Sequence, residues 1–229
     1  YKVFKFAKKN IYFLSSRLKI VDRKDRSNQP MTFDGITIIF NGEIYNISEI
    51  KKIIYSKGAT LKTNSDTELI VKMYMIFGTN CINYFEGMWA FAIFDSLKQM
   101  VFISRDRIGE KPFYFLKNNQ GFFFGSETKF IRNLYNKYNQ INHRKIYCYL
   151  KFGYKSIEQT NESFFKNIFK LEPATNIIIN KNFDIKFSKY WKPKVKDHRL
   201  SEIKCLNLIR ENFQKKMKII CKSDLKIGL

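Results

Sequence analysis

Residues 40–46, FNGEIYN, bring together groups that could stabilise a developing negative charge. Asn41 offers a side-chain amide, Gly42 a backbone N–H and Glu43 a carboxylate, directly after the apolar run 36–39. Such a run predicts a strand, and an oxyanion site needs hydrogen-bond donors on rigid backbone. Taken alone, Asn-Gly after a strand is more often a turn, because both residues tolerate positive φ. The rest of the chain has to decide between the two interpretations.

Two helices are predicted to follow this segment. Ser48 can cap the first, and Gly58 ends it. The second begins with a capping box, in which Ser65 and Glu68 each satisfy an N–H of the first turn, and it ends at Gly78. Spacing of the apolar residues defines the buried faces, which comprise Ile47, Ile50, Ile53 and Ile54 in the first helix, and Leu69, Ile70, Met73 and Phe77 in the second.

Strands and helices occur in separate groups along the chain. Strands are predicted at residues 10–14, 36–40, 88–94, 100–104, 113–116, 122–125 and 176–179. Further helices are predicted at residues 127–135 and 143–151. Short turns join neighbouring strands into antiparallel hairpins. This order favours a layered α+β fold over a doubly wound parallel sheet.

The last part of the chain differs in composition and hydrophobic pattern. Residues 194–198 are polar and predict a linker, and residues 199–221 predict one amphipathic helix. We therefore expect a first domain at 1–193, a linker at 194–198 and the start of a second domain at 199–229. The apolar, strand-like end at 224–229 predicts that the chain stops inside that second domain. Because residue 1 is Tyr, we expect the natural start to lie further upstream.

Charge and composition narrow the classes of function. The formal charge is +22, but lysines are spread along the whole chain, and abundant Asn, Ile, Phe and Tyr share A- and T-rich codons with them. Since no nucleic-acid-binding motif is present, we expect no specific nucleic-acid partner. No apolar run approaches the ~20 residues that span a bilayer, and no signal pattern opens the chain, so we expect no membrane association and a cytoplasmic location.

The cysteines and histidines predict neither a disulfide framework nor a metal site. Four cysteines lie far apart without C-x-x-C spacing, which is typical of reduced thiols in a cytosolic protein. The two histidines, His143 and His198, have no cluster of partners around them in the sequence. A histidine-based triad is therefore not expected.

Seven segments together bear on whether residues 40–46 form a turn or an oxyanion site. They are residues 16–22 (SRLKIVD), 28–31 (NQPM), 40–46 (FNGEIYN), 64–68 (NSDTE), 85–92 (FEGMWAFA), 105–114 (RDRIGEKPFY) and 125–129 (GSETK). In this order and spacing they resemble the class II glutamine amidotransferase domain of glutamine-hydrolysing asparagine synthetases. The resemblance covers nearly all of residues 1–191.

The resemblance implies a four-layer αββα sandwich of the amino-terminal-nucleophile hydrolase type. The helix from residue 199 then resembles the first helix of the family's α/β ATP-pyrophosphatase-like synthetase domain. That domain binds ATP and Mg²⁺ in the family, and the part of it that does so lies beyond this chain. No cofactor is expected in residues 1–229.

The resemblance also assigns roles to residues of this chain. Arg17 would bind the α-carboxylate of glutamine through paired donors, and Asp66 would pair with its α-ammonium group. Asn41 and Gly42 would form the oxyanion hole, and Glu43 would contact the glutamine. The pocket would further be lined by the backbone of Leu18, Lys19, Ile20 and Val21. Seen singly, Arg17 would be a surface charge, Asp66 a helix cap and Glu43 a solvated strand end.

Other matched residues have weaker claims. Four residues also follow the family's pattern: Arg105, Asp106, Lys111 and Pro112. A buried ion-pair loop near the domain interface explains them as well as substrate contact does. Ser126 and Glu127 could simply cap the helix that follows them. We expect none of these six residues to be catalytic.

The chain departs from the family pattern in its nucleophile. The family uses a cysteine at the very amino terminus, activated by its own α-amine. An Arg-Gly-Pro-Asp stretch follows in the family some thirty residues later, and neither feature is present here. Ser15-Ser16 replaces a frequent His-Arg pair, which could change the pocket. We expect the polypeptide as given to hydrolyse no glutamine.

The predicted function of the intact protein is glutamine-dependent asparagine synthesis. Glutamine is hydrolysed to glutamate and ammonia, and the ammonia reaches an aspartate activated with ATP. The sequence does not decide whether two copies of the chain form a homodimer. One alternative is an amidotransferase that amidates another carboxylate, such as a sugar acid in surface polysaccharide synthesis. Another is a non-catalytic remnant that binds glutamine or a protein partner.

Overall fold

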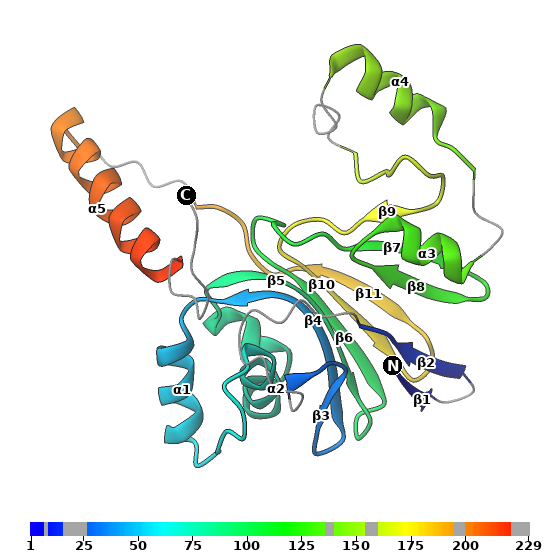
Figure 1. Cartoon of the computed structure of the whole chain (residues 1–229), viewed down its shortest axis with the longest axis horizontal. Helices are drawn as coiled ribbons and strands as arrows, with labels where there is room; N and C mark the ends of the chain where they lie inside the picture. The colour runs from blue at the N-terminus through cyan, green and yellow to red at the C-terminus, as the bar shows by residue number, and fades with distance from the viewer. Residues whose placement is uncertain (7–8, 16–26, 136–139, 154–159, 195–199, 221–229) are drawn as a thin grey trace.

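A computed structural model describes residues 1–6, 9–15, 27–135, 140–153, 160–194 and 200–220. Its centre is a six-stranded sheet in the order β11-β10-β6-β5-β4-β3, in which every pair is antiparallel (Figure 1). The strands are β3 (Met31–Phe33), β4 (Ile36–Ile44), β5 (Gly87–Asp95), β6 (Met100–Arg105), β10 (Thr175–Asn180) and β11 (Ile185–Lys189). The predicted antiparallel arrangement is confirmed.

Two helices cover one face of this sheet. They are α1 (Ile47–Ser56) and α2 (Asp66–Phe77), and a 3₁₀ helix, η2 (Gly78–Tyr84), continues from α2. Side chains alternate between the two faces of a strand, so Phe91 and Ile93 of β5 point to the helices. There they pack with Ile50, Leu69 and other residues of the same apolar cluster.

A second, smaller sheet covers the opposite face. It consists of β7 (Tyr114–Asn118), β8 (Gly121–Gly125) and β9 (Phe169–Lys170), in the order β8-β7-β9. The alternate residues of β5, Ala92 and Phe94, pack against it in a cluster that includes Phe113 and Leu171. The outer side of this sheet is covered by α3 (Thr128–Leu134), where Ile131 meets Leu116.

The layers are therefore helix, sheet, sheet and helix. The αββα architecture and the α+β class expected from the sequence are confirmed by this arrangement. A hairpin of β1 (Lys2–Phe6) and β2 (Lys9–Phe13) adds to the inter-sheet cluster through Phe13, whose ring lies 6.2 Å from that of Phe124.

Two further helices extend from the body in Figure 1. One is α4 (His143–Phe152) and the other is α5 (Glu202–Ile220), which has no buried residue. Exposed apolar residues mark α5 as amphipathic, as predicted: Ile203, Leu206, Ile209, Phe213 and Ile220. The Lys216 ammonium lies 2.6 Å from Glu86 Oε2 and ties α5 to the body. That α5 opens a second domain stays a prediction, and the expected end at 224–229 lies outside the described residues.

Three local predictions need correction. Strand β4 does not end at Phe40 but continues to Ile44, because β5 pairs with it along its whole length. Helix α1 is preceded by Asn46 as its N-cap rather than Ser48. The Asn46 side chain accepts no bond from the helix N–H groups; it bonds to residues 84 and 86 and to the Glu49 carboxylate. Strands β3, β9 and β11 were not predicted. No helix in the described ranges is long and apolar enough to cross a membrane.

Candidate functional site

The predicted oxyanion segment lies inside strand β4. Asn41, Gly42 and Glu43 face Ala90, Trp89 and Met88 of β5 in the antiparallel register. The Asn-Gly pair is therefore not a turn. Both candidate donors are carried by backbone that is held by a neighbouring strand, as preorganised stabilisation of an oxyanion requires.

Gly42 is required by a close approach of β4 and β5. Its φ is +155°, and a Cβ at this position would lie 2.1 Å from the Met88 carbonyl oxygen and 2.8 Å from Trp89 Cα. Gly87 on β5 repeats the situation, because its Cβ would lie 2.2 Å from the Glu43 carbonyl oxygen. The two glycines let the strands meet closely at this end of the pair, which fixes the backbone of the site.

The Asn41 amide is oriented by a residue from the other sheet. Its Nδ2 donates to Ser126 Oγ at 3.2 Å, and Ser126 follows strand β8. An amide carries two N–H groups, so the second is available to a ligand. Of the two possible caps of helix α3, Ser126 and Glu127, Glu127 occupies the N-cap position, and its side chain makes no cap bond. The sequence carries no local signal for this long-range contact.

Asp66 is the first residue of α2 and is 8% exposed. Ser65 caps the helix, as predicted, by accepting a bond from the Thr67 N–H at 3.2 Å. The partial positive charge of a helix N-terminus favours a carboxylate there. A buried carboxylate at this place can bind an ammonium group of a ligand that reaches it.

Glu68 does not complete the predicted capping box. Its carboxylate accepts bonds from the N–H groups of Lys62 and Thr63, at 2.8 and 2.6 Å, and from the Thr63 hydroxyl at 2.7 Å. Thr63 Oγ1 in turn accepts from the Ser65 N–H. The fully buried Glu68 thus holds the loop before α2 rather than the helix cap.

The segment after β6 is held by bonds between side chains and backbone. Asp106 Oδ1 accepts from three consecutive N–H groups, those of Ile108, Gly109 and Glu110, and its Oδ2 accepts from Trp89 and Lys111. The buried Arg105 guanidinium donates to the carbonyls of Lys111, Gly109 and Leu171. Within the described part of the chain, carbonyls rather than carboxylates accept from Arg105, so the ion-pair explanation of this loop is wrong in its bonding. Burial lowers the pKa of this guanidinium.

The charges of three carboxylates act on Tyr45, one residue past the end of β4. Partial burial, followed by the charges of Glu110, Glu43 and Asp106, raises the pKa of Tyr45 to about 12. The charges of Glu43 and Glu110 thus act on the same hydroxyl. Sequence analysis did not single out Tyr45 or Glu110, because the strand end and the loop after β6 are distant in the chain.

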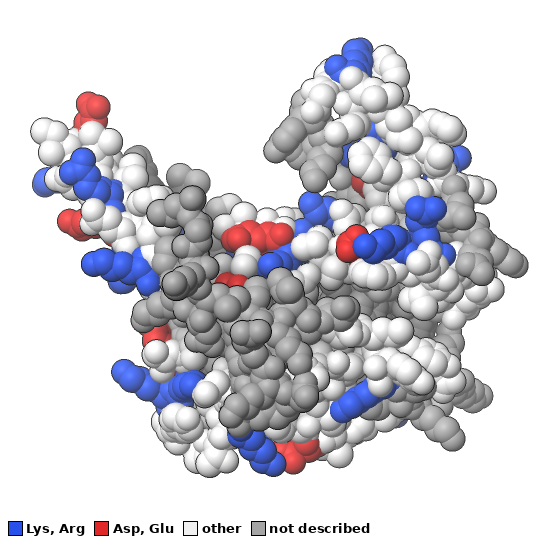
Figure 2. All heavy atoms as spheres, viewed as in Figure 1, with Lys and Arg blue, Asp and Glu red and all other residues white. Residues whose placement is uncertain are grey.

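The remaining predicted pocket residues cannot be placed. Arg17, Leu18, Lys19, Ile20 and Val21 lie outside the described residues. On the face shown in Figure 2, Lys and Arg side chains are scattered rather than gathered into one patch. Acidic side chains lie in the hollow between the two protruding helices (Figure 2).

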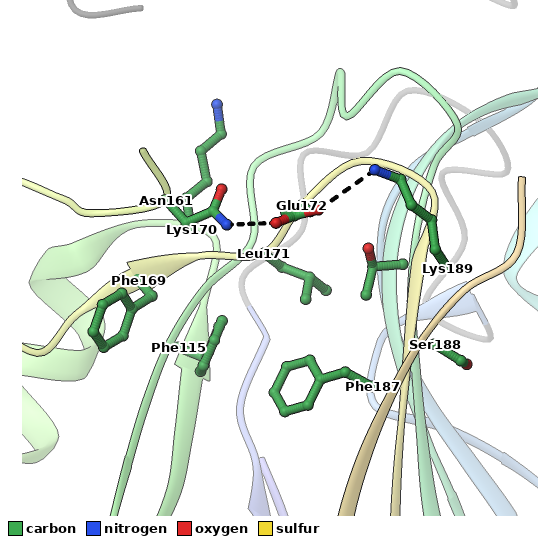
Figure 3. Close-up of a pocket in the computed structure, with 10 residues that line it drawn as sticks. Phe115, Asn161, Phe169, Lys170, Leu171, Glu172, Phe187, Ser188 and Lys189 are labelled. Atoms are coloured by element: carbon green, nitrogen blue, oxygen red, sulfur yellow. Dashed lines mark hydrogen bonds and ion pairs between the residues drawn. The ribbon is translucent and has the colours of Figure 1, made fainter. Parts of the chain in front are cut away.

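A separate cavity of about 300 Å³ lies between β9 and β11 (Figure 3). Phe115, Phe169 and Phe187 form its apolar wall. On its rim, the Glu172 carboxylate accepts from Asn161 at 2.8 Å and lies 3.4 Å from the Lys189 ammonium; the Asn161 bond lowers the pKa of Glu172. Among the described residues predicted to bind glutamine, Asn41, Gly42, Glu43 and Asp66, none lines this cavity.

In the described ranges, nothing indicates a metal-binding cluster or an activated thiol. No group of three or more His, Cys, Asp or Glu residues there could hold a metal ion. Cys81, Cys148 and Cys205 are free thiols. Burial raises the pKa of the Cys81 thiol, which makes it a poor nucleophile.

Comparison with known proteins points to one family. A model described as a glutamine amidotransferase domain matches residues 4–191. A Methanocaldococcus jannaschii protein named "Putative asparagine synthetase (glutamine-hydrolyzing) 2" is 33% identical, over 93% of this chain and 44% of its own length. Asparagine synthetase (glutamine-hydrolyzing) 1 of Bacillus subtilis is 29% identical, over 97% of this chain and 35% of its own length.

A solved structure is also similar. The glutamine phosphoribosylpyrophosphate amidotransferase from B. subtilis is 18% identical, with a TM-score of 0.47 over 70% of this chain and 31% of that one. So distant a likeness says nothing about a shared substrate. The chain spans less than half the length of the curated relatives named above.

Proposed function

The chain belongs to the family of glutamine amidotransferase domains, and on that premise we propose that it forms the glutamine-binding part of a glutamine-dependent asparagine synthetase. The observation that supports this most directly is the end of strand β4. Asn41 and Gly42 lie side by side there on backbone locked against β5, and Ser126 orients the Asn41 amide. These are the two donors that amide hydrolysis needs.

In the proposed reaction a thiolate attacks the side-chain carbonyl carbon of glutamine. Negative charge then develops on the carbonyl oxygen, and the Asn41 amide and the Gly42 N–H stabilise it. Ammonia leaves, and water hydrolyses the thioester to glutamate. Removing one such donor typically raises the barrier by ~3 kcal/mol.

The substrate's other end is proposed to lie at the start of α2. Asp66, buried at the helix N-terminus, would bind the α-ammonium group. Arg17 would bind the α-carboxylate, Glu43 would contact the glutamine, and the backbone of residues 18–21 would line the pocket. These roles extend the resemblance noted in the sequence.

The nucleophile is proposed to be an amino-terminal cysteine upstream of Tyr1 in the intact protein. Strands β2 and β8 each pair on one edge, with β1 and β7, and in the described part of the chain neither has a strand on its other edge. An upstream strand could therefore pair with β8, which Ser126 follows, and Ser126 in turn contacts Asn41. Residues 1–229 without that strand are expected to release no glutamate.

The acceptor is proposed to be aspartate, as the names of the relatives suggest. In a second domain that begins with α5, the aspartate side-chain carboxylate would attack the α-phosphorus of ATP, held with Mg²⁺, to give an aspartyl adenylate and release pyrophosphate. Ammonia would then displace AMP and give asparagine. The proposed boundaries are 1–193 for the glutaminase domain, 194–198 for the linker and 199–229 for the start of the second domain.

The test is glutamate release from glutamine by the intact protein. We expect release that falls about 10²–10³-fold in Asn41→Ala, because one oxyanion donor is lost. No release by the intact wild-type protein would contradict the proposal. Adding ATP with aspartate, or with a sugar acid in its place, and analysing the amidated product then identifies the acceptor.

A further inference from the structure

Gln29 connects the two halves of the candidate site. It lies just before strand β3, and its side chain is half-buried. Its Oε1 accepts a bond from the Phe40 N–H at 2.6 Å, and its Nε2 donates to Thr67 Oγ1 at 3.3 Å. A backbone N–H can only donate, so the amide oxygen must face Phe40 and the amide nitrogen must face Thr67.

The first bond holds the strand that carries the oxyanion donors. Strand β3 pairs with β4 through Met31 and Ile38, and continuing this register places Gln29 opposite Phe40. The Gln29 side-chain oxygen therefore takes the place of a main-chain acceptor just beyond the end of the ladder. Asn41 and Gly42 follow Phe40 directly.

The second bond holds the helix end that carries Asp66. Thr67 is the next residue of α2, it is 1% exposed, and its own N–H bonds to the helix cap Ser65. One amide thus spans from the β4 backbone to the first turn of α2. The segment 28–31 was singled out in the sequence, but no role followed for it there.

We propose that Gln29 is a positioning residue that sets the spacing between the oxyanion donors at Asn41 and Gly42 and the carboxylate of Asp66. This inference rests on the proposed function. A bound amino-acid amide reaches both ends only when its chain has the right number of methylene groups. Gln29 thereby selects glutamine over asparagine, which is one methylene shorter.

The test measures the intact protein and five variants, of which four are single substitutions. Gln29→Leu removes both bonds at similar volume, and Thr67→Val removes only the bond to α2. Gln99→Leu is the matched control, since Gln99 is equally half-buried but its amide bonds to the Ser96 carbonyl in the distant turn between β5 and β6. Two readouts are taken: kcat/KM for glutamate release, and the ratio of glutamine to asparagine affinity by calorimetry.

We expect Gln29→Leu and Thr67→Val to lower kcat/KM by up to about 10²-fold, as small misplacements at a reacting centre do. The ratio of glutamine to asparagine affinity should shrink in both. The double variant should lose little more than Gln29→Leu alone, because Gln29→Leu already removes the bond to Thr67. Thr67→Ser keeps the hydroxyl, so its affinity ratio should equal that of the parent protein. Gln99→Leu should leave it unchanged.

An unchanged affinity ratio in Gln29→Leu, with glutamine still bound by the parent, would overturn the inference while the proposed function stands. A parent that binds glutamine but releases no glutamate would contradict the proposed function, and the affinity ratio would still test Gln29. A parent that binds no glutamine would overturn both. Hydrogen exchange at the Phe40 amide should accelerate in Gln29→Leu but not in Gln99→Leu, and equal rates would also contradict the proposed link.

Discussion

Replacing Gly42 by alanine should destabilise the protein strongly. The added Cβ would lie 2.1 Å from the Met88 carbonyl oxygen and 2.8 Å from Trp89 Cα. Both atoms belong to the backbone of β5, so neither can move aside as a flexible side chain would. The φ of +155° is also strained for any residue with a side chain.

The size of the effect follows from these two terms. Backbone strain of this kind costs about 1–3 kcal/mol, and overpacking in a tight site costs a further ~1–3 kcal/mol. Gly42→Ala should therefore lower the free energy of unfolding by about 2–6 kcal/mol, a large part of the ~5–15 kcal/mol that a domain has. Urea unfolding followed by circular dichroism measures this as a lower midpoint.

Gly58→Ala provides the matched control. Gly58 also has positive φ, at +73°, but nothing lies within 4 Å of its Cβ position. It should lose only the left-handed backbone cost of about 1–2 kcal/mol. If Gly42→Ala proved no less stable than Gly58→Ala, the close approach of β4 and β5 at the site would be refuted.

Three further predictions follow from the site. Asp106→Asn should lower the free energy of unfolding by about 3 kcal/mol, because a charged acceptor of several backbone N–H bonds is lost; Asp184→Asn at an exposed turn is the control, and equal unfolding midpoints would argue against it. Tyr45, with a pKa raised to about 12, stabilises the fold fully below the unfolded pKa of ~10, and this contribution is lost as pH rises from there through 12. Tyr45→Phe should therefore flatten the loss of stability in that window, measured by urea midpoints, and an identical slope would contradict the assignment. Ser126→Ala in the intact protein should lower kcat about five- to tenfold, the equivalent of one hydrogen bond of ~1 kcal/mol, while KM stays near its original value; an unchanged kcat would show that Ser126 does not orient Asn41.

Local patterns in the sequence predicted those features that depend on neighbouring residues. The cap of α2 at Ser65, its end at Gly78 and the hairpin of β5 and β6 follow from residue types a few positions apart. The layered fold followed from the order of strands and helices. Taken alone, Asn41-Gly42 favoured a turn, and the pairing with β5 shows that it lies within a strand.

Contacts between distant segments could not be predicted in this way. Ser126 is 85 residues from Asn41, and Gln29 is 38 residues from Thr67. Ser126 had a local role available as a helix cap and Gln29 had none, and tertiary packing gave each a partner from a distant segment. Glu68 likewise had the spacing of a capping box, but the Lys62 and Thr63 N–H groups lay within its reach.

Mapping where glutamine binds tests the central claim most directly. L-Glutamine is titrated into the isotope-labelled chain, and the backbone amide resonances are followed by NMR. The proposed function predicts shifts at Gly42 and Asp66, with those of Phe115 and Phe187 around the separate cavity unchanged. Shifts confined to that cavity, or none at saturating glutamine, would contradict the assignment of the end of β4 and the start of α2 as the glutamine site.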